Sequence, residues 1–157
     1  MKGEENMKKF LSILVLAALV LALCGARLED GSVDLEAVLA EFNLGEEMLV
    51  LDAYDIADLY FIDYEDLKQV AAAVHTSGIN CDEIIMIEAV DADAAAYIKD
   101  IMDARYESKL NETENYLPDE YAIIKQCSVI ADGNYVAMIV APNAADLVAI
   151  YNASFEE

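Results

Sequence analysis

Two apolar segments joined by an Asp-Gly-Asn triplet constrain the fold more than any other feature of the sequence. The segments are residues 127–131 and 135–141, and the triplet occupies positions 132–134. Short apolar runs on either side of an Asp-Gly step predict two strands joined by a tight hairpin, because glycine readily adopts the positive φ that such turns need. Residues 135–141 are apolar at both sets of alternate positions, which predicts a strand in the centre of a sheet.

Hydrophobic periodicity and capping residues predict the other elements. Glu83–Val90 is short, branched and apolar, as expected of a strand. Residues 67–75 are ambiguous, because their apolar positions recur at helical spacing but the segment runs into a Thr-Ser-Gly turn. Helices are predicted at 33–42 with a stop at Gly45, at 52–60 with Asp52 as N-cap, from Asp91 or Asp93 to about 115, from Pro118 to 126, and from Pro142 onward. This order predicts an α+β domain with helices packed on one face of a mainly antiparallel four-stranded sheet.

The N-terminal segment has the layout of an export signal. Lys8 and Lys9 precede an apolar run of 14 residues, Phe10–Leu23, which is shorter than the roughly 18 residues expected of a spanning helix. We therefore interpret residues 1–24 as a signal peptide, 25–32 as a short tether and 33–157 as a single α+β domain. The alternative is an uncleaved signal that anchors the chain in the membrane.

Cys24 is the candidate lipidation site. Leu21, Ala22 and Gly25 fit the pattern around the acylated cysteine of bacterial lipoproteins, whereas Leu23 replaces the small residue expected before it, so the lipobox is degenerate. Lipidation predicts a protein anchored at the outer face of the cytoplasmic membrane. The alternatives are cleavage after Ala26, which predicts a secreted protein, and a Cys24 that is only one more apolar residue.

The charge balance is strongly acidic. The chain has 31 Asp and Glu residues and 9 Lys and Arg residues. Residues 1–24 hold two of the acidic and three of the basic residues, so the remainder carries a formal charge of −23. Such a chain repels nucleic-acid phosphates and anionic lipid headgroups, which excludes nucleic-acid binding and electrostatic membrane adsorption.

The sequence contains no recognisable catalytic, metal or cofactor motif, and we predict none of these sites. His75 is the only histidine, and no glycine elbow surrounds any serine. Cys81 and Cys127 follow the signal and leave a disulfide possible, though two separate thiols are the simpler interpretation. Acidic residues between Asp52 and Asp66 allow calcium binding in principle, but no calcium-loop pattern is present and a solvated acidic face explains them.

Arg105 is the most informative polar residue. It follows Ile98, Ile101 and Met102 at helical spacing and therefore falls in the middle of their apolar stripe. This position predicts a structural ion pair with a carboxylate, or an arginine stem that lies along the core, and the alternative is contact with an anionic ligand.

Nine tyrosines are the other conspicuous feature, and those near the Pro118 turn and the hairpin are expected to gather there. Half-buried packing is the simple interpretation of Tyr116, Tyr121 and Tyr135, and an aromatic contact surface is the alternative.

A series of short motifs resembles the family called domain of unknown function 4358, over about residues 33–155. The motifs are Leu59-Tyr60-Phe61-Ile62-Asp63, Ser77-Gly78-Ile79-Asn80-Cys81-Asp82-Glu83-Ile84, Arg105, Tyr116-Leu117-Pro118-Asp119-Glu120-Tyr121 and Gly133-Asn134-Tyr135-Val136. The resemblance implies an exported lipoprotein of a Gram-positive, mainly clostridial, type, a strand at 67–75 and no established activity. It marks as family-motif residues Tyr60, Asp82, Glu83, Arg105, Tyr116, Pro118, Tyr121, Gly133, Asn134 and Tyr135.

We expect a non-enzymatic binding or interaction module at the cell envelope, whose partner is an envelope protein or a small ligand. One alternative is a hydrolase that uses carboxylates such as Asp82 and Glu83. The other is a surface protein that binds divalent cations through its acidic residues.

Overall fold

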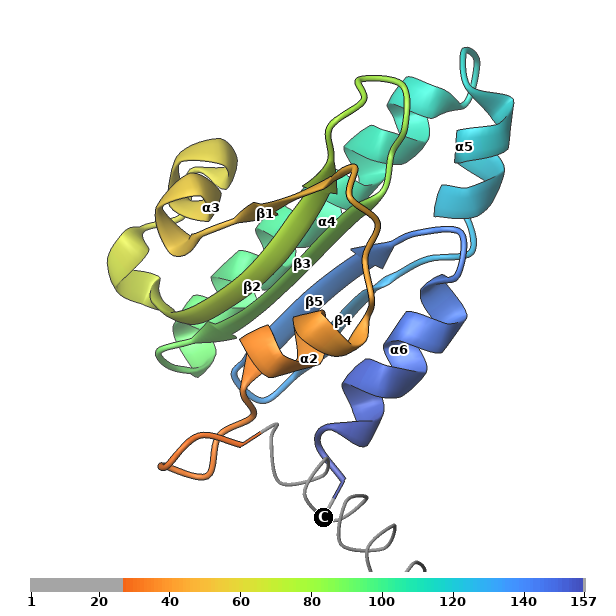
Figure 1. Ribbon diagram of the computed structural model, residues 1–157. Coiled ribbons are helices and arrows are strands. Elements are labelled where there is room, and N and C mark those ends of the chain that lie inside the picture. The colour runs from red at the N-terminus through yellow and green to blue at the C-terminus, as the bar shows by residue number, and fades with distance from the viewer. Residues whose placement is uncertain (1–26, 157) are drawn as a thin grey trace, which may run out of the picture.

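An antiparallel sheet of five strands forms the middle layer of the structure, a computed structural model that describes residues 27–156 (Figure 1). The spatial order is β1-β2-β3-β5-β4, and every neighbouring pair is antiparallel. The strands are β1 (Met48–Leu51), β2 (Leu67–His75), β3 (Glu83–Ala89), β4 (Val129–Asp132) and β5 (Tyr135–Val140).

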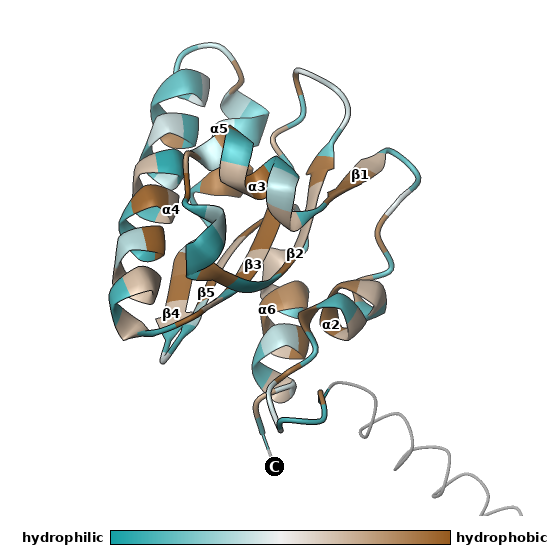
Figure 2. Ribbon diagram, turned by 90° about the vertical axis from the view of Figure 1, so that its left-hand side faces the viewer, coloured by the Kyte–Doolittle hydropathy of each residue, from teal (hydrophilic) through white to brown (hydrophobic). Residues whose placement is uncertain are grey.

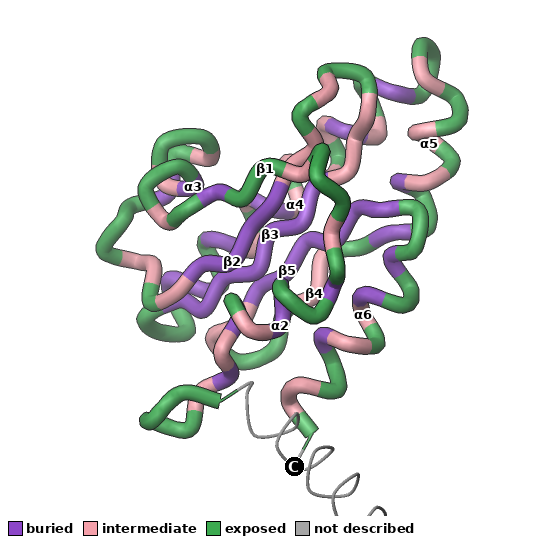
Figure 3. The backbone as a smooth tube through the Cα atoms, viewed as in Figure 1, coloured by how far each residue is buried: buried purple, intermediate pink, exposed green. Residues whose placement is uncertain are grey.

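Helices cover both faces of this sheet. The helices are α2 (Leu35–Glu41), α3 (Ala53–Tyr60), α4 (Ala92–Thr113), α5 (Pro118–Ile124) and α6 (Ala144–Ala153), with one 3-10 turn, η1 (Tyr64–Asp66). In Figures 1 and 2, α2 and α6 lie on one side of the apolar strands and the long α4 lies on the other. Figure 3 shows that buried residues run through β2, β3 and β5, and all seven residues of β3 are buried.

The central hairpin is confirmed. β4 and β5 are joined by a turn in which Gly133 has a φ of 55°, the conformation that favours glycine. β5 then pairs with β3 from Tyr135 opposite Glu88 to Val140 opposite Glu83. The predicted helices at Asp52, Asp91 and Pro118 are confirmed as well: Asp52 forms a capping box on α3, and Asp91, not Asp93, caps α4.

The structure corrects the predicted sheet in two respects. It has five strands between residues 27 and 156 instead of the four predicted. The additional strand, β1, is a four-residue edge strand, and its sequence was not predicted as a strand because it shows no readable alternation. It also has a helical layer on each face of the sheet instead of on one face only. Both faces of the central strands are therefore covered, in agreement with β3 being apolar except at its two glutamates and β5 being apolar except at Tyr135. The ambiguous segment 67–75 is strand β2, as the family resemblance implied. The first helix runs from Leu35 to Glu41 with Phe42 as its C-cap, and the residue with left-handed backbone after it is Asn43, so Gly45 is not what ends the helix.

The segment predicted as a tether folds back on the domain in its described part. Arg27 pairs with Val33 in an isolated antiparallel bridge, and its guanidinium donates to the Gly31 carbonyl at 2.9 Å. Asp30 forms a 3.0 Å ion pair with Lys68. Residues 27–33 are therefore a tight turn rather than an extended linker.

Candidate functional site

A buried charge cluster surrounds Glu83, the first residue of β3, on the face covered by α4. Glu83 is only 3% exposed. Arg105 donates from Nε at 3.0 Å and from Nη2 at 2.7 Å, the Tyr60 hydroxyl donates at 2.8 Å, and the Lys109 ammonium lies 2.8 Å from Oε2. The ion pair predicted for Arg105 is confirmed. Sequence reasoning missed Lys109, which lies one helical turn beyond Arg105 and is 4% exposed.

The electrostatics of this cluster keep Glu83 ionised. Burial raises the pKa of Glu83, but hydrogen bonds and positive charge from Arg105 and Lys109 outweigh burial and leave the pKa below its usual value. Burial and the Glu83 charge both raise the pKa of Tyr60, so its phenol remains a hydrogen-bond donor. Both carboxylate oxygens are already held by protein donors, which makes Glu83 a structural anion and not an available general base.

A second buried carboxylate, Glu88, lies near the other end of β3 on the opposite face. Lys68 donates to it at 2.8 Å, and the Gln69 amide donates as well. Gln69 also donates to the Val33 carbonyl at 2.7 Å and accepts from the Leu35 amide at 3.0 Å. An irregular register of β2 between Leu67 and Gln69 brings Lys68 and Gln69 to the same carboxylate. This network fixes the beginning of α2 on β2.

Asp82 and Glu83 point to opposite faces of the sheet. Glu83 contacts α4, whereas Asp82 lines a small cavity of about 150 Å³ together with Asn43 and Asn143, on the side of α2 and α6. Its Oδ1 is buried without a hydrogen-bond partner among residues 27–156. Burial, reinforced by the nearby charge of Glu120, raises the pKa of Asp82.

The other predicted residues do not join one site. Tyr116 is 85% exposed, Pro118 begins α5, and Tyr121 lies under the Lys125 ammonium at 5.2 Å. Tyr135 lies at the hairpin end of β5, where its ring meets Phe155 edge to face at 4.9 Å. The expected gathering of Tyr116, Tyr121 and Tyr135 is therefore wrong, because α5 joins the opposite end of β4. Gly133 and Asn134 form the hairpin turn, and the Asn134 carbonyl accepts from Ala89 at 2.8 Å.

Both cysteines in the described part of the chain are free thiols. Cys127 is buried and Cys81 is half-buried. Burial raises the pKa of each thiol, which disfavours thiolate chemistry. The proposed lipidation site Cys24 and the predicted signal peptide lie outside the described residues.

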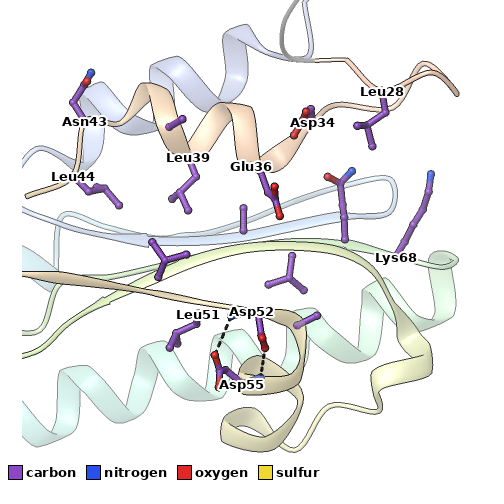
Figure 4. A pocket seen from close by; sticks show the side chains of 16 residues that line it. Leu28, Asp34, Glu36, Leu39, Asn43, Leu44, Leu51, Asp52, Asp55 and Lys68 are labelled. Carbon is purple, nitrogen blue, oxygen red and sulfur yellow. Dashed lines mark hydrogen bonds between the residues drawn. The ribbon is translucent and has the colours of Figure 1, made fainter. Parts of the chain in front are cut away.

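An open groove of about 1010 Å³ lies between α2 and the β1–β2 edge of the sheet (Figure 4). Leu39 and Leu44 point into it from above, and Leu51 lies below, at the end of β1. The apolar residues that line it include Leu39, Leu44, Val50, Val70 and Ala71. The polar residues that line it between positions 27 and 156 are acidic except for Lys68 and two amides, and the acidic residues are Asp34, Glu36, Asp52 and Asp55.

The acidic residues do not assemble a metal centre in the described chain. Residues 27–156 contain no group of three or more His, Cys, Asp and Glu side chains placed to hold a metal ion. Asp52 and Asp55 accept backbone hydrogen bonds in the α3 capping box, and Asp63 accepts from the Glu65 amide. The same described region has no helix with the length and apolarity needed to cross a membrane.

Comparison with protein families identifies the domain. The model of a domain of unknown function, DUF4358, matches residues 40–141, about two thirds of the chain. The chain belongs to the DUF4358 family. The resemblance drawn from the motifs is thus confirmed, and the match spans all five strands of this DUF4358 domain and both members of the Glu83–Arg105 pair. No curated protein and no solved structure matches the chain.

Proposed function

We propose that this DUF4358 domain is a non-enzymatic binding module of an envelope lipoprotein, anchored through Cys24 at the outer face of the cytoplasmic membrane. The observation that carries the proposal is the α2–β1 groove, which combines an apolar lining with an acidic rim. A concave surface of this kind suits a ligand with apolar and positively charged groups. The strongly negative charge of the chain is consistent with lipid, rather than surface electrostatics, as the membrane attachment.

The two charge clusters favour binding over hydrolysis. A pair of hydrolytic carboxylates must face one substrate, but Asp82 and Glu83 lie on opposite faces of the sheet. Glu83 and Glu88 are each held by a lysine and by further donors. These carboxylates stabilise the fold on which the groove is built.

The groove itself can be mapped with peptides. Amide chemical shifts of the ¹⁵N-labelled chain, titrated with short peptides of positive, neutral and negative charge, are expected to move most at Val50, Ala71 and Leu44. Peptides are suitable probes because the groove is open and includes residues of the edge strand β1 in its lining. Shifts that cluster around Tyr60 and Arg105 instead, or that occur nowhere, would contradict a binding groove.

The anchor is tested by Cys24→Ser. Cells fed a labelled fatty acid are expected to transfer the label to the wild-type protein and not to this variant, because the thiol is the atom acylated. The wild type should partition into detergent. Cys81→Ser is the matched control and should remain labelled, since Cys81 is half-buried in the folded domain. A mature protein that begins at Arg27 without lipid would contradict the anchor and leave a secreted binding module.

A further inference from the structure

Strand β1 leaves one side of its backbone unpaired at the edge of the sheet. β1 pairs only with β2, and the Thr76 amide extends this ladder by donating to the Glu47 carbonyl at 2.9 Å. Backbone groups of alternate residues point to alternate sides in an antiparallel strand. The backbone N–H and C=O of Leu49 and Leu51 therefore point toward β2, whereas those of Val50 point toward the open edge.

This edge strand is short, but it lacks the charged residues and the proline that also protect edge strands. The four residues Met-Leu-Val-Leu include no charge and no proline, and Val50 and Leu49 are 66% and 53% exposed. The opposite edge strand, β4, has α4 packed against it and ends in Asp132. An uncovered apolar edge beside a groove is the geometry at which an extended peptide adds to a sheet.

We propose that β1 accepts an extended, positively charged segment of a partner protein as a sixth strand of the sheet. This inference rests on the proposed binding function and names its occupant. The residue that pairs with Val50 places its side chain on the same face as Val50. That face carries Ala71 and Gln69 and is the floor of the groove below α2.

The charges around β1 define the occupant. Glu46 and Glu47 precede the strand, and Asp52 and Asp55 follow it. Lys68, the one basic residue among the described residues that line the groove, is already paired with Asp30 at 3.0 Å and Glu88 at 2.8 Å. The charge that this surface offers to a partner is therefore negative, and it attracts positively charged groups.

A second copy of the chain fits this edge poorly. Antiparallel pairing of β1 with β1 around a two-fold axis would place Glu46 and Glu47 of one copy beside Asp52 and Asp55 of the other. Like charges placed opposite one another oppose pairing, and each chain has a formal charge of −22. A cationic segment of another protein gains attraction at the same positions.

The experiment compares three seven-residue probes in titrations of the full chain in detergent micelles. The first alternates Lys and Val, the second is the same peptide N-methylated at alternate residues, and the third alternates Glu and Val. We expect the Lys-Val peptide to bind, the N-methylated form to bind about tenfold or more weakly because it cannot complete the backbone ladder, and the Glu-Val peptide not to bind.

A matched pair of variants locates the site. Val50→Pro removes the outward N–H while leaving the β1–β2 ladder intact, and we expect about tenfold weaker binding of the Lys-Val peptide. Val50→Thr keeps the backbone donor and the branched shape, and its affinity should stay within about threefold of wild type. The N-methylated peptide tests the same hydrogen bonds on the wild-type chain, so the result does not depend on the folding of Val50→Pro.

Four outcomes would overturn the inference. Equal binding of the N-methylated and unmodified peptides would mean adsorption to an acidic surface without strand addition. If the Lys-Val peptide does not bind while a neutral or acidic peptide shifts the amide signals of the groove, the groove binds a different occupant. A chain that dimerises without peptide and loses the dimer in Val50→Pro would make the second copy the occupant. If no peptide of any class moves the groove signals, the proposed function fails with the inference.

Discussion

Glu83→Gln is expected to lower the free energy of unfolding by about 3–5 kcal/mol, the cost of breaking a buried ion pair from one side. The substitution keeps the shape of the side chain but leaves two positive charges against a neutral amide. Arg105 is about one third exposed and can still reach water, whereas the Lys109 side chain is only 5% exposed and cannot. Urea unfolding followed by circular dichroism measures the loss.

An exposed ion pair supplies the control. Lys99 and Asp103 are paired one turn apart on α4, and their side chains are 42% and 45% exposed. Asp103→Asn should change stability by less than about 0.5 kcal/mol, because solvent already screens this pair. A Glu83→Gln protein as stable as Asp103→Asn would mean that the Glu83 cluster does not hold the fold.

The pH dependence of the same difference identifies ionisation as the cause. The pKa of Glu83 is lowered in the folded state, so its stabilising contribution is complete above the unfolded glutamate pKa of about 4.3. That contribution declines as the pH falls through the lower folded pKa, because the carboxylate must then protonate. The stability difference between wild type and Glu83→Gln should therefore be constant near neutral pH and shrink under acid conditions.

The elements that the sequence predicted correctly are those whose signal is local. The Asp132-Gly133 step, the Asp52 capping box and Pro118 at the first turn of a helix each specify a boundary through their own backbone preference. The special position of Arg105 was readable as well, since a charge in the middle of an apolar stripe pairs with a carboxylate, extends its stem along the core to water or contacts an anionic ligand. The partner could not be read, because it lies on another element and 22 positions away.

The groove and the edge strand could not be predicted for the opposite reason. β1 has four residues and is exposed at Leu49 and Val50, so it shows neither a strand alternation nor a buried run. The groove exists because the short helix α2 packs over β2 and leaves β1 uncovered, which depends on tertiary packing alone. Even Glu88, a charge inside an apolar strand, gave no indication that Lys68 and Gln69 would reach it across an irregular β2.

Gln69→Ala is expected to release α2 from the sheet and lower the free energy of unfolding by about 2–4 kcal/mol. Its amide is the only side chain in the described structure that holds both the Val33 carbonyl and the Leu35 amide, at 2.7 and 3.0 Å. Alanine leaves these two part-buried backbone groups without partners, and each such group costs about 1–3 kcal/mol. It also removes one donor from the buried Glu88.

Hydrogen exchange separates release of α2 from general weakening of the fold. In Gln69→Ala the α2 amides should exchange faster, whereas those of β3 should change only by the loss in global stability, since β3 is buried on both faces. Gln126→Ala is the matched control, because Gln126 is exposed and donates only to the Ala122 carbonyl of its own turn. It should leave α2 exchange unchanged and stability within about 0.5 kcal/mol. Since α2 is one wall of the groove, a variant in which only α2 opens should also bind groove ligands less tightly. If the α2 amides of Gln69→Ala are as protected from exchange as those of the wild type, packing of Leu35, Val38 and Leu39, rather than the Gln69 amide, holds α2 in place.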